Sequence, residues 1–263
     1  MSISRRDFLK IAGISSLGIG FSATDLLWKN RAEAVEYMTS PKGLKAKRWA
    51  MVVDVRKFKT EGDYKRVIDI CNRIHNVPDF GNTKDEVKWI WTDTFEHVFP
   101  FQQNKYLPET VQEKPFVLLC NHCDNPPCVR VCPTQATFKM KDGIVAQDYH
   151  RCIGCRFCMA ACPFGARSFN WRDPRPFIKH VNPDFPTRTK GVVEKCNFCV
   201  ERLEKGLRPA CVEVSNGGLI FGDLADPGSE VRKILSTHYS LRRKAELGTR
   251  PSVFYIIGGD EDA

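Results

Sequence analysis

The 263-residue sequence predicts an α+β protein with long irregular connections. The first observation is an internal repeat, in which a run of four cysteines beginning at Cys120 returns about 30 residues later at Cys152. The second is that the other cysteines lie outside this repeat, at Cys71 and between Cys196 and Cys211. The third is that the apolar segments are short and separated by turn-forming residues.

The chain is divided into a targeting segment, the repeat as an inserted unit, the two pieces that flank it as an outer unit, and a C-terminal extension. The predicted boundaries are residues 1–34 for the targeting segment, 46–112 plus 175–228 for the outer unit, 113–174 for the inserted unit and 229–263 for the extension.

The longest predicted element is a helix over residues 63–75, because Val67, Ile70, Cys71 and Ile74 recur on one face at helical spacing. The connections are expected to be irregular where prolines and turn formers gather. Shorter elements are predicted as strands at residues 49–55, around 89–91, at 116–119 and 253–257, a hairpin over 137–146, and helices at 200–205 and 229–238.

The cysteine spacing predicts iron–sulfur clusters. The second run reads C-x2-C-x2-C-x3-C-P, the spacing of bacterial ferredoxins, in which the fourth cysteine of each run ligates the cluster held by the other run. The first run differs only in having four residues between its second and third cysteines. The rule predicts two [4Fe–4S] clusters, cluster A on Cys120, Cys123, Cys128 and Cys162, and cluster B on Cys152, Cys155, Cys158 and Cys132.

Four of the twelve cysteines remain, and they suffice for a third [4Fe–4S] cluster, cluster C, on Cys71, Cys196, Cys199 and Cys211. The alternative is that Cys71 is a buried free cysteine and the other three hold a [3Fe–4S] centre. His122 or His150 could replace a thiolate, as in Rieske centres, but the cysteine count leaves no vacancy. Zinc sites use two separated cysteine pairs rather than four cysteines in eleven residues.

The sequence predicts no catalysis by this chain alone, but a role as a subunit of an oxidoreductase complex. The Gly217-Gly218 and Gly258-Gly259 pairs do not form a phosphate-binding loop, and no Ser/His/Asp spacing suggests a triad. The formal charge of +9 falls to about +1 once residues 1–34 (net +2) are removed and three clusters contribute about −6. We therefore expect no nucleic-acid partner.

The pattern resembles the four-cluster iron–sulfur subunits of respiratory complexes, a family that includes electron-transfer subunits of dimethyl sulfoxide, polysulfide and nitrite reductases. In that family four cysteine motifs pair as first with fourth and second with third, which builds two bacterial-ferredoxin-like units, one inserted in the other. The resemblance implies this nesting here, over nearly all of the chain that follows the targeting segment.

One cluster of the family pattern is missing. Residues 58–64 (FKTEGDY) stand where the first motif has three cysteines, and Ser215 stands at the last position of the fourth. These four positions would ligate a single cluster, whereas Cys71 and its three partners are the complete set for the neighbouring one. The lost cluster resembles the one nearest a molybdenum subunit, so we expect no such partner.

Residues 151–176 are similar to the periplasmic ferredoxin subunits of membrane complexes that serve dissimilatory sulfite reduction. This resemblance implies two partners, a polytopic quinone-interacting membrane subunit and a multihaem cytochrome c, through which the chain associates peripherally with the membrane. It also implies an electron path in the order A–B–C, with cluster A facing the membrane subunit. The alternatives are a subunit of a molybdopterin reductase or hydrogenase complex, a self-contained iron–sulfur enzyme, or a disulfide-stapled protein.

The first 34 residues are typical of an export signal. Residues 4–10 (SRRDFLK) form a twin-arginine motif, a weakly apolar stretch follows, and residues 32–34 (AEA) suit cleavage. The stretch is shorter than the roughly 20 apolar residues that span a bilayer. Because the twin-arginine route carries folded proteins, clusters could be inserted in the reducing cytoplasm before export. We therefore expect a location in the periplasm or on the outer face of the cytoplasmic membrane.

Overall fold

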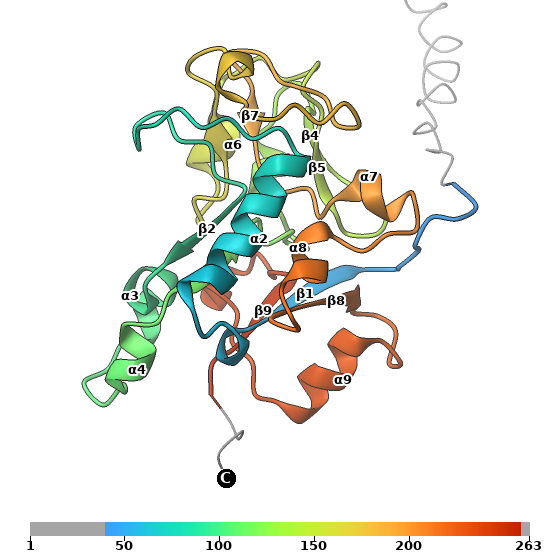
Figure 1. The fold of residues 1–263 in the computed structure, drawn as a ribbon. Helices are drawn as coiled ribbons and strands as arrows, with labels where there is room; N and C mark the ends of the chain where they lie inside the picture. The colour runs from blue at the N-terminus through green and yellow to red at the C-terminus, as the bar shows by residue number, and fades with distance from the viewer. Residues whose placement is uncertain (1–39, 259–263) are drawn as a thin grey trace, which may run out of the picture. The chain divides into compact units, whose positions relative to one another are not determined.

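A three-stranded sheet joins segments from both ends of the protein, which a computed structural model describes over residues 40–258. The central strand β1 (Trp49–Asp54) runs antiparallel to β8 (Leu219–Asp223) and parallel to β9 (Val253–Ile256) (Figure 1). Every residue of β1 is buried, which accounts for its almost uninterrupted apolar sequence.

The two faces of β1 pack on different cores. Ala50 and Val52 face α9 (Glu230–Thr237) and contact Val231 of that helix. Met51 and Val53 face the main core, which also contains several of the cysteines. The sheet therefore supports the cysteine-bearing segments on one side only.

Helix α2 (Glu61–Ile74) packs against α8 (Ala210–Val214), so two segments far apart in sequence lie side by side (Figure 1). At its start the Asp63 carboxylate accepts the backbone N–H of Thr60 at 2.8 Å, as in a capping box. Tyr64, Val67 and Cys71 form its buried face. The sequence predicted this helix within two residues of its observed start.

Three small antiparallel pairs surround this centre: β2 (Ile90–Asp93) with β3 (Phe116–Leu119), β4 (Thr137–Lys139) with β5 (Val145–Gln147), and β6 (Ser168–Phe169) with β7 (Val193–Glu194). The β4–β5 pair is the predicted hairpin. The remaining helices are short: α3 (Phe95–Val98), α4 (Glu109–Gln112), α5 (Pro127–Arg130), α6 (Phe157–Ala160) and α7 (Val200–Leu203).

Several predictions concern the division of the chain into units, its export signal and its relation to the membrane. From Pro41 onward the contacts define one compact unit, and the division into an outer and an inserted ferredoxin-like unit stays a prediction. Helices α5 and α6 pack together within the cysteine repeat, as α2 and α8 do outside it. The export signal and the acidic end of the chain lie outside the described residues. Within residues 40–258, no helix is both long and apolar enough to cross a membrane.

Aromatic side chains occupy the region where the sequence lacks four family cysteines. The rings of Phe58 and Tyr64 stack with centroids 5.1 Å apart. Gly218 lies so close that a Cβ built there would be 2.5 Å from the Phe58 ring. Ser215 is buried, and its hydroxyl accepts the Leu219 N–H at 2.9 Å. At two of the positions near the missing cluster, Phe58 therefore packs in the core and Ser215 makes a backbone hydrogen bond.

Candidate iron–sulfur centres

All twelve cysteines lie in the described part of the chain, and all are free thiols. Four buried thiols contributed by two separate segments are the donor set of a [4Fe–4S] cluster. Free thiols also argue against the disulfide-stapled alternative. The arrangement of the thiols decides whether the residues fit such clusters.

The set predicted for cluster C forms one buried group. Burial raises the pKa of the Cys71 thiol well above its usual value, and the nearby thiols of Cys196, Cys199 and Cys211 raise it further. Burial likewise raises the pKa of Cys211 to about 12. Cys71 reaches this group because α2 packs on α8, which carries Cys211. The structure therefore brings together the four residues that the sequence left over.

The set predicted for cluster A also forms one group. Burial raises the pKa of Cys123 to about 12, with further contributions from the thiols of Cys120, Cys128 and Cys162. All four cysteines line a single small cavity. Phe164 and Arg167, which follow Cys162 in the sequence, also line the cavity.

The set predicted for cluster B lies nearer the surface. Burial raises the pKa of Cys158, and the thiols of Cys152 and Cys132 are among the groups that raise it further. Cys155 lies in the same loop, and three of the four residues, all but Cys158, are partly exposed. Although burial opposes it, the pKa of Cys132 is lowered, because hydrogen bonds such as the one from the Thr137 N–H at 3.4 Å favour its thiolate.

Contacts between the sets bear on the predicted order of the centres. Cys120 of set A adds to the rise in the pKa of Cys196 of set C, and Cys128 of set A packs with Cys158 of set B. These contacts bring thiols of set A near both other sets, which favours the order B–A–C over the predicted A–B–C. Spacing identifies which cysteines share a cluster but not which face of the repeat meets α2 and α8.

Two buried cations beside the thiolates were missed in the sequence. The Arg167 guanidinium lies near Cys128, Cys158 and Cys120, between sets A and B, and donates to Thr137 Oγ1 at 3.2 Å. The Lys195 ammonium donates to the carbonyls of Val145 and Cys196. Such cations offset the negative charge of ligating thiolates. In the sequence these two residues could be recognised only as basic residues close to a cysteine motif, and basic residues are common on exposed surfaces too.

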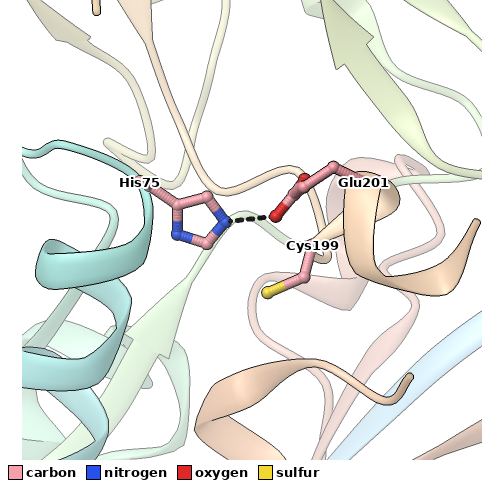
Figure 2. Close-up of side chains that lie close together, drawn as sticks. All are labelled: His75, Cys199 and Glu201. Atoms are coloured by element: carbon pink, nitrogen blue, oxygen red, sulfur yellow. Dashed lines mark hydrogen bonds and ion pairs between the residues drawn. The ribbon is translucent and has the colours of Figure 1, made fainter. Parts of the chain in front are cut away.

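A third missed residue is His75, which lies beside set C (Figure 2). His75, Cys199 and Glu201 have potential ligand atoms that all lie within 4.8 Å of one another. His75 Nε2 is 3.0 Å from Glu201 Oε1. The other two histidines considered in the sequence differ: His150 is exposed, and His122 stacks on Phe198 and accepts the Val145 N–H at 3.1 Å.

A glycine in the loop of set B gives a direct test of this geometry. Gly154 has φ +70°, and a Cβ there would overlap the carbonyl oxygen of Gly191. We expect Gly154→Ala to displace the Cys152–Cys158 loop and to remove about four irons per chain, measured by iron and sulfide analysis.

The control is Gly165→Ala. Gly165 also has a positive φ, of +64°, but nothing lies within 4 Å of a Cβ built there. This variant carries the same type of backbone strain, about 1–2 kcal/mol, without the overlap. It should keep its iron, and equal iron in the two variants would contradict the described loop.

Comparison with known proteins agrees with these centres. A family model described as a 4Fe-4S dicluster domain matches residues 112–175. The chain is 40% identical to "Hdr-like menaquinol oxidoreductase iron-sulfur subunit 1" of Archaeoglobus fulgidus, over 98% of this chain and 100% of that one. It is 36% identical to "Menaquinone reductase, iron-sulfur cluster-binding subunit" of Nitratidesulfovibrio vulgaris, over 83% of this chain and 92% of that one.

A shorter match, 41% identical, is to a subunit of the polysulfide reductase of Wolinella succinogenes, over 52% of this chain and 64% of that one. The dicluster match and the nearly full-length similarity confirm the family expected from the cysteine pattern. The protein carries [4Fe–4S] clusters and belongs to the family of iron–sulfur electron-transfer subunits of respiratory oxidoreductase complexes.

Proposed function

We propose that the chain holds three [4Fe–4S] clusters on the sets A, B and C and relays single electrons between a quinone-interacting membrane subunit and a second redox protein. The observation that supports this best is the buried group that Cys71 forms with Cys196, Cys199 and Cys211. We further propose that the groups sit in two nested ferredoxin-like units.

A [4Fe–4S] cluster supplies a site that accepts and releases one electron with little change in structure. The residues of this chain supply the rest. They hold the thiolates in place, bury set C and three of the four cysteines of set A, and offset charge through Arg167 and Lys195. The thiols of set A that lie near sets B and C support an order in which electrons that enter at the partly exposed set B pass A before C, or the reverse.

The partners are proposed from the relatives and from the sequence. Two relatives are named for menaquinol or menaquinone, which supports a quinone-interacting membrane subunit as one partner. The proposed second partner is a multihaem cytochrome c, and the proposed process is dissimilatory sulfur or sulfite metabolism. The twin-arginine motif supports export to the periplasmic side of the membrane.

Anaerobic purification with iron and sulfide analysis and EPR tests the cluster count. We expect about twelve irons per chain and three centres after full reduction. About eight irons with two centres would remove set C from the proposal. A [3Fe–4S] signal that belongs to Cys196, Cys199 and Cys211 would instead favour a three-cysteine centre.

A molybdopterin reductase complex is the second candidate, because the family includes a polysulfide reductase subunit. The aromatic filling by Phe58 and Tyr64 counts against it, since a cluster next to a molybdenum subunit would be expected there. Co-purification of the endogenous complex distinguishes the two: a molybdenum-containing subunit would favour this candidate, and haem c would favour the first.

A further inference from the structure

His75 lies in a closed environment at the end of α2. Its side chain is 1% exposed. One face stacks on Trp89, with ring centroids 4.4 Å apart, and the edge of Phe185 meets it at 4.9 Å. Its main-chain carbonyl accepts Arg188 Nη1 at 2.5 Å. Ring and backbone are therefore fixed, and the imidazole has little freedom to turn.

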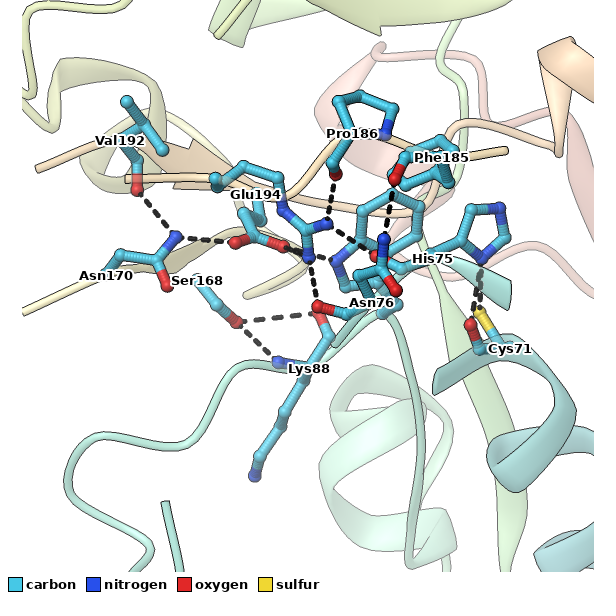
Figure 3. Close-up of polar contacts among 12 residues, drawn as sticks. Cys71, His75, Asn76, Lys88, Ser168, Asn170, Phe185, Pro186, Val192 and Glu194 are labelled. Carbon is cyan, nitrogen blue, oxygen red and sulfur yellow. Dashed lines mark hydrogen bonds and ion pairs between the residues drawn. The ribbon is translucent and has the colours of Figure 1, made fainter. Parts of the chain in front are cut away.

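Both ring nitrogens of His75 face specific groups (Figures 2 and 3). Nδ1 is 2.9 Å from the carbonyl oxygen of Cys71 and 3.4 Å from the Cys71 sulfur. Nε2 is 3.0 Å from Oε1 of Glu201, and Asn197 Nδ2 donates to the other oxygen of this carboxylate, Oε2, at 2.9 Å. The ring is thus oriented by a carboxylate at one end and directed at a cysteine at the other.

The partners of Nδ1 determine where its hydrogen lies. A carbonyl oxygen only accepts hydrogen bonds, so Nδ1 must carry the hydrogen and donate it. The backbone N–H of His75 already donates to this same carbonyl, at 3.1 Å. The Nδ1 hydrogen is therefore shared between an oxygen that already has a donor and a sulfur that, as a ligating thiolate, only accepts.

We propose that His75 is a positioning residue for cluster C, whose Nδ1–H donates to the Cys71 thiolate, orients that ligand and raises the reduction potential of the centre. The inference rests on the proposed ligation of set C by Cys71. A hydrogen bond to a ligating sulfur stabilises the reduced, more negative state of a cluster more than the oxidised state. It adds to the proposed function a residue that sets how readily the third centre accepts an electron.

The same geometry could instead place His75 as an iron ligand. Its ring atoms lie within 4.8 Å of the Cys199 sulfur and of Glu201. However, Nδ1 is occupied by the Cys71 carbonyl, and Nε2 is directed at the Glu201 carboxylate. Both nitrogens are directed at protein oxygen atoms while these contacts persist, so the structure favours donation to sulfur over ligation.

The first experiment uses the unaltered protein. Protein labelled with ¹⁵N-histidine is reduced, and pulsed EPR measures the nitrogen couplings of each centre. Centre C is identified by the signal that is missing from Cys211→Ala. We expect a weak ¹⁵N coupling at centre C that disappears in His75→Phe. The absence of any coupling, or a strong coupling typical of a ligand, would overturn the proposal.

The second experiment is a redox titration of the three EPR signals. In His75→Phe, which keeps an aromatic ring against Trp89 but has no N–H, the reduced-to-oxidised ratio of centre C at a fixed potential should fall about tenfold, a shift of about 59 mV to lower potential. Centres A and B should not move. His75→Gln, which retains an N–H donor, should recover part of the shift.

Trp89→Phe is the matched control, because it disturbs packing on the same imidazole and leaves its N–H in place. Its centre C should keep the potential of the unaltered protein. An equal shift in Trp89→Phe and His75→Phe would assign the effect to packing and reject the proposal. If His75→Phe loses centre C, the ¹⁵N coupling of the unaltered protein and the potential of His75→Gln decide whether His75 donates to the cluster. An unaltered protein with only two centres would instead refute the proposed function.

Discussion

Replacing Cys71 with serine is expected to remove cluster C, and with it about four of about twelve irons per chain and one of three EPR centres. Cys71 is the only member of set C on α2, so no other cysteine can take its place. The three remaining thiols tolerate the loss of iron because burial raises their pKa values, that of Cys211 to about 12, so they are neutral at pH 7 without metal. Iron and sulfide analysis with EPR provides the measurement.

Ser215→Ala is the matched control for this experiment. Ser215 is buried at the end of α8, where the family pattern has a cysteine, and its hydroxyl accepts the Leu219 N–H. Its replacement should cost about 1 kcal/mol of stability and no iron. If Cys71→Ser kept the iron content and EPR spectrum of the unaltered protein, Cys71 would be a buried free cysteine and the third set would lose its fourth ligand.

The largest expected effect on stability comes from Arg188→Met. Arg188 and Glu194 form an ion pair at 2.5 Å in which both side chains are fully buried. Glu194 also accepts Trp89 Nε1 at 3.0 Å and Asn170 Nδ2 at 2.6 Å (Figure 3). Removal of the guanidinium leaves an uncompensated buried carboxylate, which should lower the free energy of unfolding by about 3–5 kcal/mol.

Thermal denaturation followed by fluorescence and by loss of the cluster absorbance measures this change. Arg175→Met serves as the control, because its ion pair with Asp173 at 2.6 Å is exposed, and the variant should be indistinguishable from the unaltered protein. The double variant Arg188→Met/Glu194→Gln should recover part of the loss, since it removes the unpaired charge. A loss in Arg188→Met no larger than in Arg175→Met would contradict the described network.

The sequence predicted the elements with a strong local pattern. The strand at residues 116–119 and the helix that carries Cys71 have apolar spacing that does not depend on distant partners. Strand β8 was missed because it follows a run of turn formers, Asn216-Gly217-Gly218, and forms only by pairing with β1. Helices α5 and α6 have four residues each, too few for a helical period to show.

For the centres, the sequence supplied the grouping of cysteines but not their surroundings. Cysteine spacing is a local property that the clusters themselves dictate. The contacts of His75, Arg167 and Lys195 instead depend on segments 20 to 126 residues away, such as Glu201 for His75. A single histidine or arginine in one sequence gives no sign of such contacts, because the same residues are common on solvated surfaces.

The place of β1 in its sheet determines when the protein can be completed. β1 needs Val253–Ile256 beside it, a strand from the other end of the described residues. The three-stranded sheet can therefore be completed only after its last strand, β9, has been synthesised. A polypeptide interrupted before Val253 would contain all twelve cysteines but leave one edge of β1 without its parallel partner, so closure of the sheet depends on a strand that carries no cysteine.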